Sequence, residues 1–173
     1  MTTPHIPPHP TGQWRAMSTA DLPMISAISD AVHGDYSERP DIYAERLTLY
    51  PAGCRIFERD GTILGYLISH PWPRGAPPKL NALLGAIPEE TDSYYLHDIA
   101  LMPAARGSGA GAQATAFVLH HAQEAGLREI RLVAVNGADS FWSGQGFTLA
   151  PEGQDAAAAY GPGCYLMHRE IAA

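Results

Sequence analysis

The chain has 173 residues and a formal net charge of −7, and 46% of its residues are hydrophobic. This length and apolar content predict one globular domain with a sizeable core. A net negative charge argues against nucleic acid as the main partner, and no apolar run approaches the roughly 20 residues of a membrane span.

The first 13 residues, MTTPHIPPHPTGQ, are rich in proline and lack the charged-then-apolar pattern of a secretion signal. We expect a disordered tail over residues 1–13 and a single folded domain over 14–173. Cys54 and Cys164 lie far apart and have no partner motif, which favours two free thiols in a reducing, cytoplasmic compartment. The sequence predicts no metal site.

The N-terminal half predicts two helices followed by a β-hairpin. Ser18 and Thr19 are good N-cap residues for the first helix, and the second runs from 40 to about 49. Two β-rich runs then flank Asp60-Gly61. An Asp-Gly pair suits the two positive-φ positions of a type I′ turn, so these runs are expected to form a hairpin.

Residues 71–93 predict a long connection between strands. Within it the spacing of four apolar residues predicts one short helix: Leu80, Leu83, Leu84 and Ile87. Packing is the ordinary role for Trp72. The alternative is that the connection, which enters the next strand a few residues before His97, roofs a pocket lined by Trp72, Leu80, Leu83 and Leu84.

The C-terminal half predicts a strand over 94–102, a glycine loop, and a helix that ends at Gly126, a natural C-cap. A buried strand over 130–135, a short aromatic-rich helix and a last strand follow. The predicted order is α-α-β-β-β-α-β-(α)-β. This order is typical of a mixed α/β or α+β domain with a strand–helix–strand crossover.

The glycine loop predicts a phosphate site. Backbone N–H groups at a helix start, together with the helix dipole, attract an anion. Gly107, Gly109 and Gly111 would let a ligand approach closely, and Arg106 adds a positive charge. The loop lacks the Gly-Lys-Ser/Thr of a Walker loop, and its G-x-G-x-G spacing does not fit a dinucleotide fingerprint. A bare surface loop is the alternative interpretation.

These residues carry a family resemblance. LHDIALMPAARGSGAG resembles the central motif of the GNAT superfamily of N-acetyltransferases, in which an apolar strand and a proline precede R-G-x-G-x-G at a helix start. LVAVN followed by SFWSGQGF is similar to the family's next strand, its asparagine, and its aromatic-rich helix ending in Gly-Phe. The resemblance covers about residues 14 to 170. It implies the GNAT fold: a central mixed, mostly antiparallel sheet flanked by helices.

The resemblance also implies acetyl-CoA as co-substrate. In the family the pyrophosphate sits on the glycine loop, which here comprises Arg106, Gly107, Ser108, Gly109, Ala110, Gly111 and Ala112. The pantetheine arm pairs like an added strand with the backbone of Ile99, Ala100 and Leu101. A backbone N–H there polarises the thioester carbonyl. Asn136 matches the family's asparagine that contacts the cofactor.

His97 is the candidate general base, because it occupies the strand position where family members carry a Glu or His that removes the amine proton. An amine must lose a proton before it attacks a thioester, and imidazole suits this task. Tyr95 should share the face of His97, and Asp98 should point to the other face unless the strand bulges. By resemblance to polyamine-acetylating members, Asp98 helps to hold a cationic substrate. The alternative is that His97 and Asp98 only satisfy one another or nearby backbone.

Trp142 is a departure from the family pattern, because it stands where members commonly carry the tyrosine that protonates the leaving CoA thiolate. An indole N–H is too weak an acid for that step, although it can donate a hydrogen bond. We expect the Trp142 ring to border the acetyl group. Tyr160 and Tyr165 are the later candidates for the acid.

The sequence thus predicts an acetyltransferase that moves an acetyl group directly from acetyl-CoA to a primary amine. Neither cysteine sits in a nucleophile motif, so no covalent enzyme intermediate is expected. The acceptor is a small-molecule or peptide amine, with cationic amines included, and the protein is a monomer or a homodimer. The alternative from another class is a catalytically weak module that binds and senses acyl-CoA, for which Trp142 is the best support.

Overall fold

The computed structural model describes residues 12–172, which fold around one mixed sheet. The strands are β1 (Gln13–Ala16), β2 (Cys54–Arg59), β3 (Thr62–Trp72), β4 (Ser93–Leu101), β5 (Glu129–Ala134), β6 (Thr148–Leu149) and β7 (Tyr165–Glu170). The α-helices are α1 (Leu22–His33), α2 (Pro40–Leu49), α3 (Ala110–Glu124), α4 (Asp139–Gly144) and α5 (Gln154–Ala158). Residues 1–11 of the expected tail lie outside the described residues, and Gln13 already belongs to β1.

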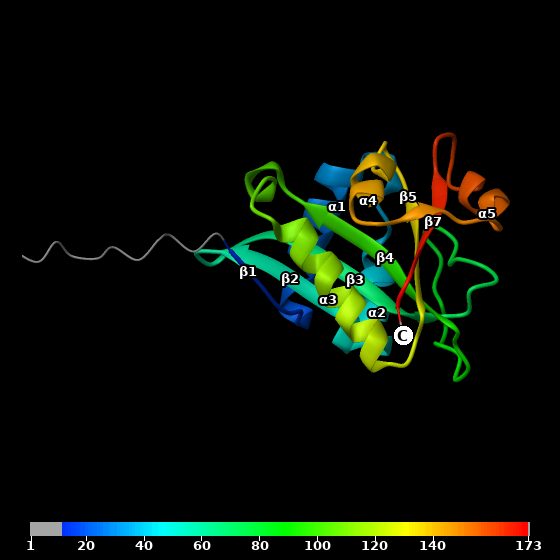
Figure 1. Cartoon of the computed structure of the whole chain (residues 1–173). Coiled ribbons are helices and arrows are strands. Elements are labelled where there is room, and N and C mark those ends of the chain that lie inside the picture. The colour runs from blue at the N-terminus through cyan, green and yellow to red at the C-terminus, as the bar shows by residue number, and fades with distance from the viewer. Residues whose placement is uncertain (1–11, 173) are drawn as a thin grey trace, which may run out of the picture.

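The seven strands run in the order β1-β2-β3-β4-β5-β7-β6. Every neighbouring pair is antiparallel except β4 and β5, which are parallel and joined by the crossover helix α3. Helix α3 lies across one face of the sheet, and α1 and α2 lie against the opposite face (Figure 1). This is the mixed, mostly antiparallel sheet flanked by helices that the sequence predicted.

Each face of the sheet has its own core. Under α3, the helix side chains Ala114 and Val118 pack on β4 and β5 through residues such as Leu96 and Leu132. On the opposite face, a second cluster buries α1 and α2 against β2 and β3. The sheet is therefore fixed from both sides, which makes its strand ends a rigid platform.

Local chemistry explains the first half of the chain. The predicted first helix begins after a capping box, in which the Asp21 carboxylate accepts the Ser18 N–H at 2.8 Å. Helix α2 begins with Pro40 at its first position, where the missing N–H has no cost. In the β2–β3 hairpin, Asp60 has φ 52° and Gly61 has φ 76°, which confirms the predicted type I′ turn.

The short helix predicted within 71–93 is wrong, because the stretch between β3 and β4 contains no helix. Asn81 has φ 60° and Gly85 has φ 76°, and both values interrupt a right-handed helix. The backbone N–H groups of Asn81, Leu84 and Gly85 donate instead to the carboxylates of Glu38 and Glu45. Leucine spacing alone could not reveal these distant partners.

Candidate active site

The site begins where β4 and β5 separate. The two strands pair only at Tyr94 with Ile130 and at Tyr95 with Arg131, although β4 continues to Leu101. The Met102 N–H donates to Leu64 on the β3 side at 2.8 Å. Because successive residues of a strand direct their backbone groups to opposite edges, those of Leu101 point to the open side. An extended ligand can therefore pair with the end of β4 as an added strand.

A cavity of about 680 Å³ occupies this opening. It runs from the glycine loop past the end of β4 to the connection between α1 and α2. It brings together most of the residues predicted from sequence: Tyr95, His97, Asp98, Ile99, Leu101, Arg106, Gly107, Gly109, Ala110, Gly111, Ala112, Asn136 and Trp142. Ala100 and Ser108 are not among its lining residues. Ala100 is buried in the core under α1, and the Ser108 hydroxyl caps the loop by accepting the Ala110 N–H at 3.3 Å.

The glycine loop opens α3 in a left-handed conformation. Gly109 is the N-cap with φ 84°, and a Cβ there would meet no atom within 4 Å, so its backbone angle is what favours glycine. Gly111 differs, because a Cβ there would lie 2.8 Å from the ring of Phe141. The first-turn N–H groups of α3 have no partner within the helix, and they open beside the exposed Arg106. The loop thus offers an anion both backbone donors and a positive charge.

His97 sits on a β-bulge. In the β3–β4 ladder, Ile68 pairs with Asp98 and Ser69 pairs with Leu96, which leaves His97 as an extra residue in β4. A bulge re-aims the side chains around it. From the sequence, Asp98 should point away from His97 unless the strand bulges. The bulge is present, and both side chains line the same cavity.

The His97 side chain is buried against a carboxylate. Its Nε2 lies 2.6 Å from Glu38 Oε1, with the His97 side chain 2% exposed and that of Glu38 3% exposed. Its other ring nitrogen, Nδ1, is buried and has no hydrogen-bond partner among the described residues. An ionised carboxylate only accepts, which favours a proton on Nε2 beside Glu38. Neutral His97 then keeps its lone pair on Nδ1.

Asp98 has different partners. Its Oδ1 lies 2.6 Å from His33 Nε2, and its Oδ2 accepts a hydrogen bond of 2.6 Å from the Tyr66 hydroxyl. Burial raises the pKa of Asp98, but the positive charge of His33 and these hydrogen bonds outweigh burial, and the pKa lies below its ordinary value. Burial lowers the pKa of His33, but Asp98 outweighs it and the pKa is raised. Asp98 and His97 therefore do not satisfy one another, since each has its own partner.

Two tyrosines extend from His97 to the connection between β3 and β4. Tyr95 is buried, and its hydroxyl is hydrogen-bonded to Tyr160. The Tyr160 hydroxyl donates to the Pro78 carbonyl, and burial raises the pKa of Tyr160 to about 12. Tyr160 lines the cavity, whereas Tyr165 lies on β7, is 40% exposed and is not among the lining residues. Of the two acid candidates named from sequence, only Tyr160 is at the site.

Trp142 borders the cavity from α4 and is otherwise part of the core. It is 4% exposed, and its ring meets those of Phe141 and Phe147 edge to face at centroid distances of 4.9 and 5.4 Å. Phe141 lines the cavity as well and is 43% exposed. Two aromatic rings therefore form the α4 wall.

Sequence reasoning missed the residues that α1 and its following connection bring to the site. His33, Tyr36 and Glu38 all line the cavity. Glu38 and His97 are 59 residues apart in the sequence, and His33 and Asp98 are 65 apart. No local pattern marks such pairs, and only the packing of α1 on the sheet creates them.

Cys54 and Cys164 are both free and buried. Within residues 12–172, no group of three or more His, Cys, Asp or Glu side chains is arranged to hold a metal ion. No helix in this described part of the chain is long and apolar enough to cross a membrane.

Comparisons with known proteins agree with this geometry. A curated relative, the "Uncharacterized N-acetyltransferase ycf52-like" of Prochlorococcus marinus, is 31% identical over 86 residues, which is 48% of this chain and 48% of the relative. The match therefore spans about half the length of that relative.

Two solved structures share the fold over most of both chains. The GphF GNAT-like decarboxylase in complex with isobutyryl-CoA has a TM-score of 0.75 at 15% identity and covers 92% of this chain and 100% of its own. Arabidopsis thaliana Naa50 in complex with the bisubstrate analogue CoA-Ac-MVNAL has a TM-score of 0.67 at 16% identity and covers 92% of this chain and 98% of its own.

The family model for the acetyltransferase (GNAT) family matches residues 20–147, which contain the glycine loop, His97 and Asp98 of β4, and Trp142. The divergent β4 and β5, the glycine-rich start of α3 and the cavity between them agree with that assignment. The chain belongs to the GNAT family of acetyltransferases.

Proposed function

We propose that the protein is an N-acetyltransferase that moves an acetyl group from acetyl-CoA to a primary amine, with His97 as general base. The observation that carries this proposal is the single cavity that joins the glycine loop to the buried Glu38–His97 pair. One end suits a phosphate-bearing co-substrate, and the other end suits removal of a proton.

Acetyl-CoA fits the residues present. The first-turn N–H groups of α3 and the guanidinium of Arg106 are matched to a pyrophosphate. The open edge of β4 near Ile99 and Leu101 is matched to the amide groups of a pantetheine arm. The exposed Asn136, with φ 54° after β5, stands at the other side of the opening. Acetyl-CoA supplies the activated acyl group, and the chain supplies orientation and proton transfer.

His97 prepares the acceptor. An amine that enters as an ammonium ion must lose a proton before its lone pair attacks the thioester, and His97 Nδ1 takes that proton directly or through a water. A backbone N–H on the open edge of β4 stabilises the negative charge that develops on the carbonyl oxygen. Both substrates are bound together, and no side chain of the enzyme becomes acetylated.

The acceptor is a small-molecule or peptide amine. The acceptor end of the cavity is lined mainly by apolar and aromatic groups, among them Val32, Tyr36, Leu80 and Tyr160. Both carboxylate oxygens of Asp98 are engaged by His33 and Tyr66, so Asp98 contributes to a cationic acceptor mainly through its charge.

Release of CoA thiol with a panel of primary amines tests the function. The wild-type protein should release thiol with at least one amine. His97→Ala should lower kcat/KM for that amine by about 100-fold or more and flatten the acidic limb of the pH–rate profile. Acetyl-CoA affinity, measured by calorimetry, should stay the same. Tight acetyl-CoA binding without acetylation of any amine would instead favour the acyl-CoA-sensing alternative.

A further inference from the structure

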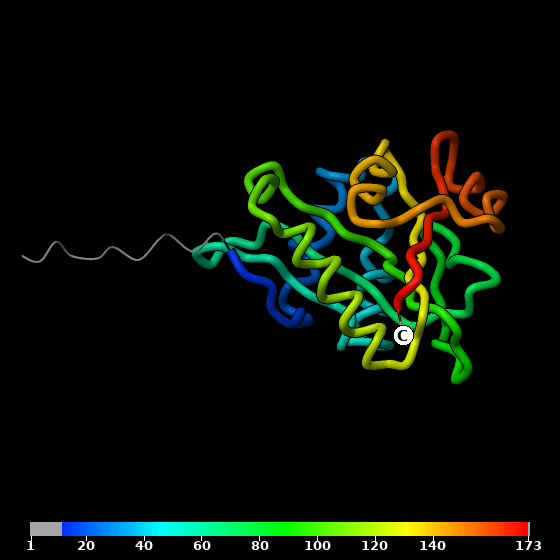
Figure 2. The backbone as a smooth tube through the Cα atoms, in the orientation of Figure 1, coloured from blue at the N-terminus to red at the C-terminus, as the bar shows by residue number. Residues whose placement is uncertain are grey.

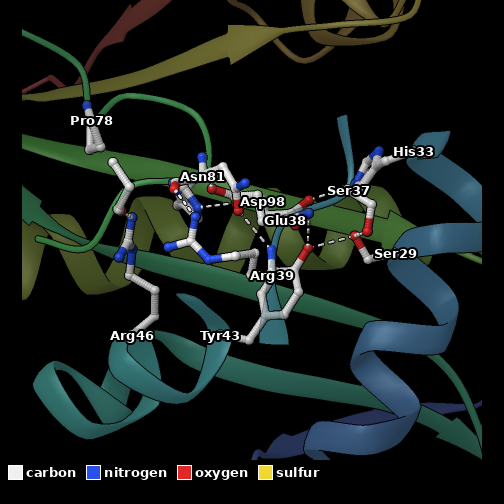
Figure 3. A network of polar contacts seen from close by, with 12 residues as sticks. Ser29, His33, Ser37, Glu38, Arg39, Tyr43, Arg46, Pro78, Asn81 and Asp98 are labelled. Atoms are coloured by element: carbon white, nitrogen blue, oxygen red, sulfur yellow. Dashed lines mark hydrogen bonds and ion pairs between the residues drawn. The ribbon is translucent and has the colours of Figure 1, made fainter. Parts of the chain in front are cut away.

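Glu38 makes two contacts that no acetyl transfer chemistry requires by itself. Its Oε1 lies 2.6 Å from His97 Nε2, and its Oε2 accepts from the backbone N–H of Asn81 at 2.8 Å. Asn81 belongs to residues 78–85 of the connection between β3 and β4, which we call the roof segment. One carboxylate thus binds the candidate base and the roof segment at once. Figure 3 shows Glu38 and Arg39 beside Asn81.

The backbone of Glu38 is itself fixed. Its N–H donates to the Tyr43 hydroxyl at 3.0 Å, and that hydroxyl lies 2.6 Å from Ser29 Oγ. The neighbouring Arg39 completes a reciprocal clamp, because its N–H donates to Asn81 Oδ1 at 2.8 Å and its Nη1 donates to the Asn81 carbonyl at 3.0 Å. The Glu38 side chain therefore has little freedom to leave either partner.

Other contacts also hold the roof segment, among them a hydrogen bond of 3.2 Å from Arg46 to the Ala82 carbonyl. Glu45 of α2 accepts the N–H groups of Leu84 at 2.6 Å and Gly85 at 3.0 Å. Tyr160 donates to the Pro78 carbonyl from the C-terminal part of the chain, which lies at the same end of the molecule as the roof segment (Figure 2). Leu80 of the roof segment lines the cavity. Among these contacts, only the one with Glu38 also reaches His97.

We propose that Glu38 is a positioning residue, which holds His97 as the Nε2–H tautomer and makes that tautomer depend on the roof segment being in place. This inference rests on the proposed role of His97 as base. Because Oε1 and Oε2 each contact a fixed neighbour, rotation of the carboxylate would break both contacts. The lone pair of His97 is then confined to Nδ1.

The substitution Glu38→Gln should break this arrangement, because an amide has one acceptor oxygen where the carboxylate has two. If the oxygen keeps the Asn81 N–H, the amide NH₂ faces His97 and favours the Nδ1–H tautomer. If the oxygen keeps His97, the NH₂ meets the Asn81 N–H and the roof segment is displaced. In either case, the residue at position 38 can no longer accept hydrogen bonds from both His97 Nε2 and the Asn81 N–H.

The groups facing His97 allow the pH profile to be interpreted. They are Glu38, His70 of β3, and Tyr95 and Asp98 of β4, while His33 of α1 faces Asp98 and Glu38 in turn. Burial, with the charge of His97, lowers the pKa of His70 to about 3. The pKa of Asp98 is also below its ordinary value. Neither group changes charge between about pH 5 and 8, but burial is outweighed at His33 and its pKa is raised. The contribution of the Glu38–His97 contact is therefore identified by comparing variants and not by the acidic limb of the wild type alone.

The first test uses the wild-type full chain labelled with ¹⁵N-histidine. Long-range ¹H–¹⁵N correlations distinguish the two tautomers, and a His97→Gln variant assigns the signal. We expect the Nε2–H tautomer for His97 near neutral pH. An Nδ1–H tautomer in the wild-type protein would overturn the proposal, and this measurement does not depend on whether any Glu38 variant folds.

The second test compares Glu38→Gln with Arg39→Ala, a matched control that removes the side-chain donor to the Asn81 carbonyl in the same roof segment without touching His97. Glu38→Gln should lower kcat/KM for the amine by about tenfold or more and shift the acidic limb. Arg39→Ala should raise KM for the amine and leave the acidic limb where it is. Equal acidic limbs in the two variants would refute a link through His97. Both proteins should bind acetyl-CoA like the wild type.

A double-mutant cycle separates this inference from the proposed function. If Glu38 acts through His97, Glu38→Gln should cause less than about a twofold further loss in a His97→Ala background. A full additional loss there would show that Glu38 acts by another route. If His97→Ala alone keeps wild-type activity, the general-base proposal fails. The tautomer found in the wild-type protein still decides the positioning role.

Discussion

Asp98→Asn tests how much the buried pair beside the active site stabilises the fold. Asp98 accepts from His33 and from Tyr66, both at 2.6 Å, and its side chain is 10% exposed. Asparagine offers one acceptor oxygen, so one buried donor loses its partner, at a cost of about 1–3 kcal/mol. The His33 cation also loses its counter-charge, which brings the expected loss of unfolding free energy to about 3–5 kcal/mol. For a chain of this size the melting temperature should fall by roughly 10 °C.

This loss should depend on pH. The pKa of His33 is raised above 6.5 in the folded protein, so its contribution is complete below that value and is lost as pH rises through the folded pKa. The pKa of Asp98 is lowered below 3.8, so its contribution is present above that value and is lost as pH falls through the folded pKa. The gap between wild type and Asp98→Asn should therefore be widest near about pH 5.5 and should narrow near about pH 9.

Urea denaturation of both proteins at these two pH values measures the gap. The control is Asp41→Asn, which removes an ion pair with Arg39 in which the side chains are 55% and 51% exposed. That change should cost less than about 1 kcal/mol. The reasoning is refuted if Asp98→Asn costs no more than the control, or if its cost is the same at both pH values.

Gly109→Val forces a β-branched residue to φ 84° and should weaken acetyl-CoA binding more than about tenfold in calorimetric titration, while circular dichroism stays that of a folded protein; unchanged affinity would exclude the phosphate role. Gly111→Ala should displace the Phe141 ring, whose nearest atom lies 2.8 Å from the new Cβ, and raise KM for acetyl-CoA; an unchanged KM would show that the ring moves freely. Trp142→Phe keeps an aromatic wall but replaces the indole with a smaller ring that has no N–H, so kcat should change by no more than about tenfold, and a loss of several hundredfold would show that the indole itself is required at the site. Burial raises the pKa of Cys54 to about 12, so its thiol should react with a disulfide reagent at pH 8 only after unfolding, and rapid reaction of the folded protein would contradict its burial.

Several features follow from the sequence because they depend on nearest neighbours. Proline at the first position of α2 and the Asp60-Gly61 pair of the hairpin act through local backbone angles, and both elements form where the sequence predicts them. The glycine loop and the apolar strand before it carry the family resemblance because they form one local sequence motif.

Other elements could not be predicted from the sequence, because contacts with distant parts of the chain stabilise them. Strand β1 has only four residues, but it pairs with β2 along its whole length, and its Trp14 indole donates to the Ala110 carbonyl across 96 residues of sequence. The roof segment has helical leucine spacing, yet carboxylates of Glu38 and Glu45 take its N–H groups. A local pattern has no information about such partners.

The sequence by itself determined the family, the order of most elements, and His97 as candidate base on its strand. Only the tertiary structure decided that His97 meets Glu38, that Asp98 meets His33, and that a bulge directs both β4 side chains into one cavity. The physical reason is that a buried polar atom must find a partner, and the partners available are set by how α1 and its following connection pack on the sheet.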